Sequence, residues 1–127
     1  MPNAADEIAF DIMSRWADTF SKFDPEAQAS LYSKHALFFG SNPTLYQGRE
    51  GVAAYFEALP KWDSRAVRFT DVSTAQVNPE LVNFAAIASF DVDGVPKLSV
   101  KITWVIAREG SDWKIVSHHV SSKAPLI

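Results

Sequence analysis

The sequence contains no cysteine, and this absence excludes disulfide bonds, thiol nucleophiles and thiolate-bound metals. It also has no basic run: 12 Lys and Arg residues stand against 15 Asp and Glu residues, which gives a net charge of -3. A chain of this charge lacks the positive surface to which nucleic acids and anionic membranes are drawn. We therefore expect no nucleic-acid partner and no membrane partner.

Long apolar runs are missing too, so the sequence offers no candidate membrane span. Asp6 and Glu7 stand where a secretory signal would need positive charge followed by an apolar run. Internal repeats, linkers and low-complexity segments are also absent. These absences predict a soluble cytoplasmic protein. Its 127 residues, 47% hydrophobic and 13% aromatic, predict one globular domain over residues 1–127.

What the sequence does contain is a strongly patterned C-terminal stretch, Pro96 to Ser122. Two runs rich in Val, Ile, Thr and Trp flank the turn Glu109-Gly110-Ser111-Asp112, which predicts a β-hairpin. Because side chains alternate along a strand, each run has two distinct faces. One face is expected to carry Val100, Ile102, Trp104, Ile106, Val116, His118 and Val120. The other face of the second run is expected to carry Trp113, Ile115, Ser117, His119 and Ser121.

The N-terminal part has helical periodicity instead. Apolar residues step by four from Ile8 to Phe20, which predicts an amphipathic helix from about Ala4 to Phe23 with Asn3 as its cap.

Two further helices are expected before the long strands. Asp24-Pro25 has the cap and first-turn residues of a short helix that ends near Tyr32. A third helix is predicted to begin at Gly48 and to be closed by Pro60.

Strands are expected at residues 36–39, 66–77 and 81–92, and Asp93-Gly94 is a hairpin turn that leads into the C-terminal pair. Helices first and strands last predict an α+β fold with the helices packed on one face of a curved antiparallel sheet. Such a sheet would curl round the first helix into a cone whose open mouth suits a small molecule.

The order of elements resembles that of the nuclear transport factor 2-like superfamily, as do the motifs YQGREGVAAYFEAL, DGVP and WKIVSHHVSS. The resemblance covers nearly the whole chain and is closest to the SnoaL-like group and to the association domain of calcium/calmodulin-dependent protein kinase II. It implies a cystatin-like cone. It does not imply one activity, because the superfamily includes isomerases, cyclases, dehydratases, carriers and oligomerisation domains.

The resemblance also implies what the site lacks. Ketosteroid isomerases of this fold use an aspartate base at the position of Gly40 and an oxyanion tyrosine at that of Trp16. Their supporting tyrosine and second acid fall at Phe56 and Trp104. Each catalytic oxygen is therefore replaced, and steroid isomerase chemistry is not expected.

The kinase association domain lines its pocket with two arginines and a histidine. Those arginines fall at Val120 and Trp104 here, and the histidine falls at Val52, so an anion-binding pocket of that type is not expected. Both comparisons place Trp104 and the face of His118 inside the cone.

The expected interior is an aromatic box. The candidate ligand-binding residues are Trp16, Phe38, Tyr55, Phe56, Phe84, Phe90, Trp104 and His118. Aromatic residues at regular spacing usually fill a core and leave no cavity. The small residues Gly40, Ala86 and Ala88 face this set, however, and favour a modest pocket.

His118 is the candidate catalytic residue, as a general acid or base, although a lone histidine on an apolar face is more often structural. We expect it to be buried and neutral at pH 7. His119 should point the other way, and His35 should be solvated. No spacing of histidines and carboxylates suggests a metal site, so no metal and no cofactor are expected.

Three functions fit this sequence: a module that binds a small apolar or aromatic molecule, a SnoaL-like enzyme that uses His118, and an oligomerisation domain. We favour the first, because no nucleophile–base pair or complete acid–base pair is visible. A homodimer is also expected, through an outer sheet face too apolar to leave in water. That face would carry Ala85, Ile87, Thr103, Val105, Ile115 and His119.

The replaced catalytic positions generate a first prediction. The protein should not measurably isomerise a β,γ-unsaturated ketosteroid, because Gly40 supplies no base and Trp16 supplies only an N–H donor. Each lost element typically costs about a hundredfold in rate. An absorbance assay with a true isomerase as positive control measures this. Turnover within about tenfold of that control would contradict the residue placement.

Overall fold

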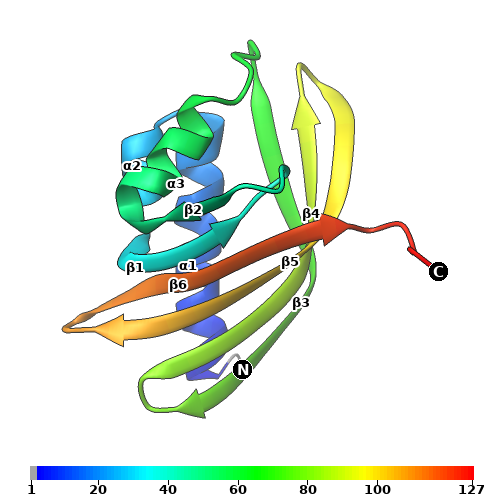
Figure 1. The fold of residues 1–127 in the computed structure, drawn as a ribbon. Helices are drawn as coiled ribbons and strands as arrows, with labels where there is room; N and C mark the ends of the chain where they lie inside the picture. The colour runs from blue at the N-terminus through cyan, green and yellow to red at the C-terminus, as the bar shows by residue number, and fades with distance from the viewer. Residues whose placement is uncertain (1–2) are drawn as a thin grey trace.

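The computed structural model describes residues 3–127, and its first helix, α1 (Ala4–Ser21), lies across the concave face of the sheet (Figure 1). The side chain of Asn3 accepts a hydrogen bond from the Asp6 N–H at 2.9 Å, and Asp6 accepts one from Asn3 in return. This capping box confirms the predicted cap. The apolar stripe is buried against the sheet: Ala5, Ala9, Ile12, Met13, Trp16 and Phe20. Among the described residues, no helix has the length and apolarity needed to cross a membrane.

Helix α1 ends two residues earlier than predicted, in a Schellman motif. The N–H of Asp24 donates to the carbonyl of Thr19 at 3.0 Å, and the N–H of Phe23 donates to that of Phe20 at 3.1 Å. Phe23 takes the left-handed conformation, with φ of 51°, where glycine is the usual residue. A bulky residue in this conformation is strained, so other contacts of Phe23 must hold it there.

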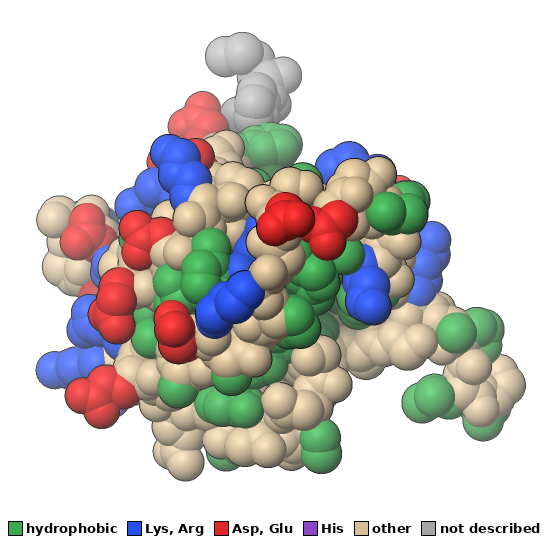
Figure 2. Space-filling model, turned by 90° about the horizontal axis from the view of Figure 1, so that it is seen from above, with side chains coloured by type: hydrophobic (Ala, Val, Ile, Leu, Met, Phe, Trp, Pro, Cys, Tyr) green, Lys and Arg blue, Asp and Glu red, His purple; other side chains and the backbone are tan. Residues whose placement is uncertain are grey.

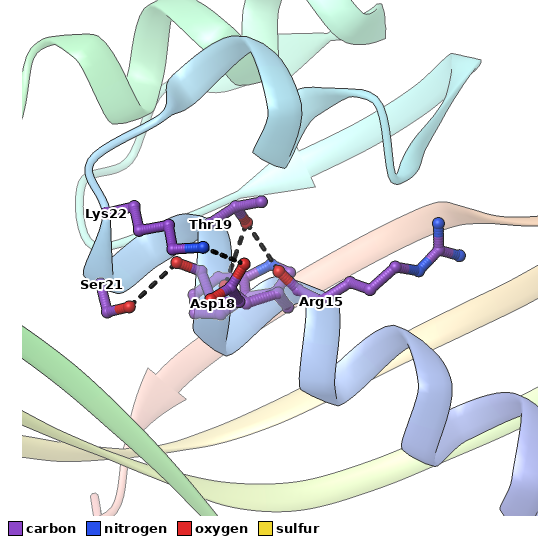
Figure 3. A network of polar contacts seen from close by, with 6 residues as sticks. Arg15, Asp18, Thr19, Ser21 and Lys22 are labelled. Atoms are coloured by element: carbon purple, nitrogen blue, oxygen red, sulfur yellow. Dashed lines mark hydrogen bonds and ion pairs between the residues drawn. The ribbon is translucent and has the colours of Figure 1, made fainter.

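Side chains complete the last turn of α1 (Figure 3). The Thr19 hydroxyl donates to the carbonyl of Arg15 at 2.9 Å, and the Ser21 hydroxyl donates to that of Asp18 at 2.9 Å. Lys22 forms an ion pair with the Asp18 carboxylate at 3.1 Å. The Lys22 N–H already donates to the Asp18 carbonyl at 3.1 Å, so these side chains add second hydrogen bonds and an ion pair to the helix end.

The second helix, α2 (Pro25–Ala29), begins as predicted, since the Asp24 side chain accepts a hydrogen bond from the Ala27 N–H at 3.1 Å. It ends at Ala29, before the predicted end near Tyr32, because β1 begins at Tyr32. The third helix, α3 (Gly48–Glu57), starts at the predicted glycine and ends before Pro60.

The sheet has six strands, and it is curved and unclosed (Figure 1). They are β1 (Tyr32–Phe39), β2 (Leu45–Gln47), β3 (Arg65–Asn78), β4 (Leu81–Val92), β5 (Val95–Glu109) and β6 (Asp112–Ser122). Their order across the sheet is β2-β1-β6-β5-β4-β3, and β1 runs parallel to β6 whereas the other neighbours are antiparallel. This arrangement confirms the predicted α+β cone. Strand β2 was not predicted, because three residues are too few for a periodic pattern.

Both predicted hairpin turns are present. Asp93 and Gly94 have φ of 52° and 78°, the left-handed pair that a tight two-residue turn requires. Gly110 joins β5 to β6 with φ of 64°.

A β-bulge in β6 corrects the predicted faces of the C-terminal hairpin. Val105 pairs with Ser117 whereas the next residue, Ile106, pairs with Ile115, so Val116 is an extra residue. Ile115 therefore points inward and is 0% exposed, on the same side as His118. The prediction that Ile115 belongs to the outer face, and Val116 to the face of His118, is wrong.

The homodimer remains a prediction, now placed on the corrected outer face. Ile87 and Val105 remain half-exposed there, and large apolar patches on one chain are commonly covered by a second. We predict a dimer at micromolar concentration, and a monomer when Ile87→Glu and Val105→Glu are combined, because the two-fold contact would then bury like charges. Light scattering coupled to size exclusion measures both.

The matched control is Phe10→Glu, which adds the same charge on an exposed position of α1 and should leave the dimer intact. A wild-type monomer at these concentrations would contradict the prediction.

Candidate functional site

A cavity of about 270 Å³ lies between α1, α3 and the inner face of the sheet. Seven of the residues that line it are aromatic: Trp16, Phe20, Phe38, Tyr55, Phe56, Trp62 and Phe90. Aliphatic residues complete most of the rest: Leu59, Pro60, Val92, Leu98, Val100, Ile102 and Val120. Gly40, Ser41, Lys97 and His118 are the remaining members. Viewed from above, hydrophobic side chains lie in a hollow with charged residues around it (Figure 2).

Six of the eight predicted ligand-binding residues line this cavity: Trp16, Phe38, Tyr55, Phe56, Phe90 and His118. The other two, Phe84 and Trp104, do not. Their rings stack on each other at 4.5 Å and each is 1% exposed, so they fill the core. Phe84 lies six residues along β4 from Phe90, away from the mouth of the cone, where the interior is closed by packing.

The small residues do not create the space that was expected of them. Ala86 and Ala88 are buried but are not part of the lining. Gly40 is in the lining, yet a Cβ placed on it would lie 2.4 Å from Cζ of Tyr55, so the tyrosine ring already occupies that room. The Tyr55 hydroxyl accepts a hydrogen bond from the Ser41 N–H at 2.8 Å and contacts the Ser41 hydroxyl at 2.7 Å. Tyr55 is therefore a fixed wall of the cavity.

The polar centre of the site is His118 on β6. Contacts with β1 and β5, and through β1 with α1, fix its position. Its Nδ1 lies 2.9 Å from the Tyr32 hydroxyl on β1 and 2.9 Å from Nε1 of Trp104 on β5. Nε1 of Trp16, on α1, donates to the same tyrosine hydroxyl at 2.9 Å. Sequence reasoning missed Tyr32, because it placed this residue at the end of a helix.

These contacts assign the protonation of His118. An indole N–H can only donate, so the contact with Trp104 requires an unprotonated Nδ1. The Tyr32 oxygen accepts from Trp16, which leaves its own O–H to donate to the same nitrogen. A neutral imidazole has one protonated nitrogen, so His118 carries its proton on Nε2.

The surroundings of His118 keep it neutral. It is 3% exposed, and its ring stacks on Phe38 at 3.9 Å. Burial, with a smaller contribution from the nearby His119, lowers its pKa to about 3. Burial likewise raises the pKa of Tyr32. The residues that line the cavity include no Asp or Glu, and no three His, Asp or Glu side chains within residues 3–127 are placed to hold a metal ion.

A buried cation, Arg65, lies beside the cavity and contacts two of its lining residues. The Arg65 guanidinium is sandwiched by aromatic rings, 4.1 Å from Phe23, 5.0 Å from Phe20 and 5.5 Å from Trp62. Burial lowers the pKa of Arg65. This stack holds Phe23 in its strained conformation and places Trp62 at the cavity. No sequence signal indicated Trp62, because it lies in the loop after α3 and a loop has no periodicity.

The protonation of His118 generates a prediction about stability. The pKa of His118 is about 3 in the folded chain and 6.5 as its ordinary value. Between these values the unfolded chain binds a proton that the folded chain does not bind. This contribution is complete above pH 6.5 and is lost as the pH falls toward 3. Between pH 7 and 5 it should lower the free energy of unfolding by about 2 kcal/mol. Urea denaturation at both pH values measures the change.

The control is His118→Gln, whose amide oxygen can accept the same hydrogen bonds but does not titrate. The difference between the two proteins should shrink from pH 7 to pH 5, because only the wild type loses this contribution. An unchanged difference would contradict a neutral, buried His118.

The model of the SnoaL-like domain family matches residues 10–125, nearly the whole chain. No curated protein sequence matches this chain significantly.

Solved structures share the fold at low identity. A Nostoc punctiforme domain described as having a cystatin-like fold has a TM-score of 0.82 and 19% identity, over 98% of this chain and 82% of that one. A Xanthomonas campestris protein named for the calcium/calmodulin-dependent protein kinase II association domain has a TM-score of 0.85 and 19% identity, over 99% and 91%. A Novosphingobium aromaticivorans protein named for scytalone dehydratase has a TM-score of 0.83 and 10% identity, over 93% and 83%. Identities this low establish the fold alone, whereas the family match spans the chain: this protein belongs to the SnoaL-like domain family.

Proposed function

We propose that the protein binds a small, apolar, aromatic molecule in the cavity. The observation that carries this proposal is the composition of the walls: seven aromatic side chains and only one buried polar side chain, a neutral histidine. An apolar cavity of about 150 Å³ holds one benzene ring. The present volume, about 270 Å³, suits a molecule of two fused rings. This volume is slightly below the usual range of ligand pockets, which starts at about 300 Å³.

An enzymatic role for His118 has less support. A general acid or base works best when its pKa lies near the working pH, and burial moves that of His118 to about 3. Nδ1 is occupied by two donors, and no carboxylate in the lining could orient the ring for proton transfer. The similarity to a protein named for scytalone dehydratase favours the enzymatic alternative only through the shared fold.

An oligomerisation role is compatible with binding. The expected dimer would use the outer face of the sheet, while the cavity is enclosed by its inner face and the helices. A homodimer whose two copies each bind one ligand is therefore part of the proposal.

Binding is tested with 1-tetralone, a fused bicyclic ketone of the expected size. Ligand-observed NMR or calorimetry should detect one saturable site per chain. The variant Val100→Phe places a ring into the cavity and should weaken binding at least about tenfold, since excluding two methylene contacts costs about 1.6 kcal/mol.

The matched control is Val77→Phe, the same exchange at an exposed position of β3 outside the lining. It should bind 1-tetralone as the wild type does. Equal weakening in both variants, or no binding to the wild type at millimolar concentration, would overturn the proposed function.

A further inference from the structure

One polar atom in the wall of the cavity has no partner. The hydrogen bonds of His118 within the described residues all involve Nδ1, and none involves Nε2. Among the described residues, the fully buried side-chain atoms without a hydrogen-bond partner are Gln28 Nε2 and Asp91 Oδ1, and neither residue lines the cavity. The ring of His118 does line the cavity, and its Nε2 is not among these fully buried atoms, which indicates that Nε2 faces the cavity. The wall thus presents an N–H donor inside an otherwise apolar space.

We propose that His118 is a specificity-determining residue, whose Nε2–H selects ligands that place a neutral hydrogen-bond acceptor, such as an aryl ketone or quinone oxygen, at the inner end of the cavity. This inference rests on the proposed function and names its ligand class. A hydrocarbon of the same shape would leave the donor buried without a partner, which is the costly case for a polar group. A ligand that offers only a donor would meet another N–H.

The direction of this hydrogen bond cannot reverse without breaking the network. The other tautomer would carry its proton on Nδ1, which would then face the N–H of Trp104 at 2.9 Å. The indole has no acceptor to offer in exchange, and Trp104 is packed against Phe84 so that it cannot turn away. His118 is therefore fixed as a donor toward the ligand.

The other polar side chains of the wall are engaged or lie nearer to solvent. The Tyr55 hydroxyl is engaged by Ser41, Lys97 is an exposed residue of β5, and Trp62, the other indole donor without a hydrogen bond, is half-exposed in the loop after α3. Selection at the inner end thus depends on His118. Around it, the rings of Trp16 and Phe90 can pack against the faces and edges of a fused ring system.

The first test compares 1-tetralone with 1-methylidenetetralin, in which a CH₂ group replaces the carbonyl oxygen at nearly the same size. We expect the ketone to bind about tenfold or more tightly, the effect of one well-placed hydrogen bond. Equal affinities would overturn the selection by His118 and leave the proposed function standing. Binding of neither molecule would overturn both.

The second test reads the tautomer in the unliganded protein. A long-range proton–nitrogen NMR spectrum of the imidazole rings should show His118 protonated at Nε2 and unprotonated at Nδ1. A proton at Nδ1, or a charged ring at pH 7, would overturn the inference whatever the ligands do.

The third test uses His118→Phe, which keeps an aromatic ring and removes the donor. The ketone should lose its advantage while 1-methylidenetetralin binds no worse, a ratio that a merely structural defect would not change. His119→Phe is the matched control, because the neighbouring side chain points away from the cavity, and it should preserve the ratio. A preserved preference in His118→Phe would overturn the inference, and the NMR measurement decides the case if that variant does not fold.

Discussion

The site depends on one constraint: the indole of Trp104 can donate a hydrogen bond and cannot accept one. Because it points at Nδ1 of His118, the histidine must be neutral and must carry its proton on the side of the cavity. Through Tyr32 the same network reaches Trp16, so that strands β5, β6 and β1 are joined to helix α1. Each bond adds only about 1 kcal/mol of net stability, but a group left without its partner in this core would cost more. The network therefore sets both the chemistry of the wall and the position of the helix that closes it.

The regular elements could be predicted because their signals are local. The cap at Asn3, the turn at Asp93-Gly94 and the inward direction of His118 follow from residue type and periodicity, and the structure agrees with them. The sheet could be predicted for the same reason: long alternating runs leave few other ways to bury their apolar face.

The errors arise where tertiary structure overrides a local pattern. A single inserted residue, Val116, inverts the alternation of β6 and turns Ile115 inward, and no local signal marks the insertion. Tyr32 lies at the boundary between a helix and a strand, where sequence patterns are least informative. The boundary between cavity and core could not be predicted either, since Phe84 and Phe90 have the same character on the same face. Only the packing of the folded chain decides which of the two rings lines the cavity and which fills the core.

One strained residue, Phe23, lies beside the cavity, in contact with a residue that contacts its wall. Phe23 adopts a conformation that glycine would take more readily, but its ring and that of Trp62 enclose the guanidinium of Arg65. A glycine would relax the backbone and remove one side of this enclosure. The aromatic side chain of Phe23 is therefore explained by its contact with Arg65, and not by the end of α1.

The protonation of His118 has a consequence for how binding would be read in solution. A histidine at a ligand site ordinarily makes affinity change with pH near neutrality, because its charge changes there. This one remains uncharged throughout that range, so the wall offers the same donor at pH 6 as at pH 8. Any dependence of affinity on pH between those values would then originate in the ionisation of the ligand. The pH profile of binding would report the acid–base chemistry of an unknown ligand, because the charge of His118 would not change.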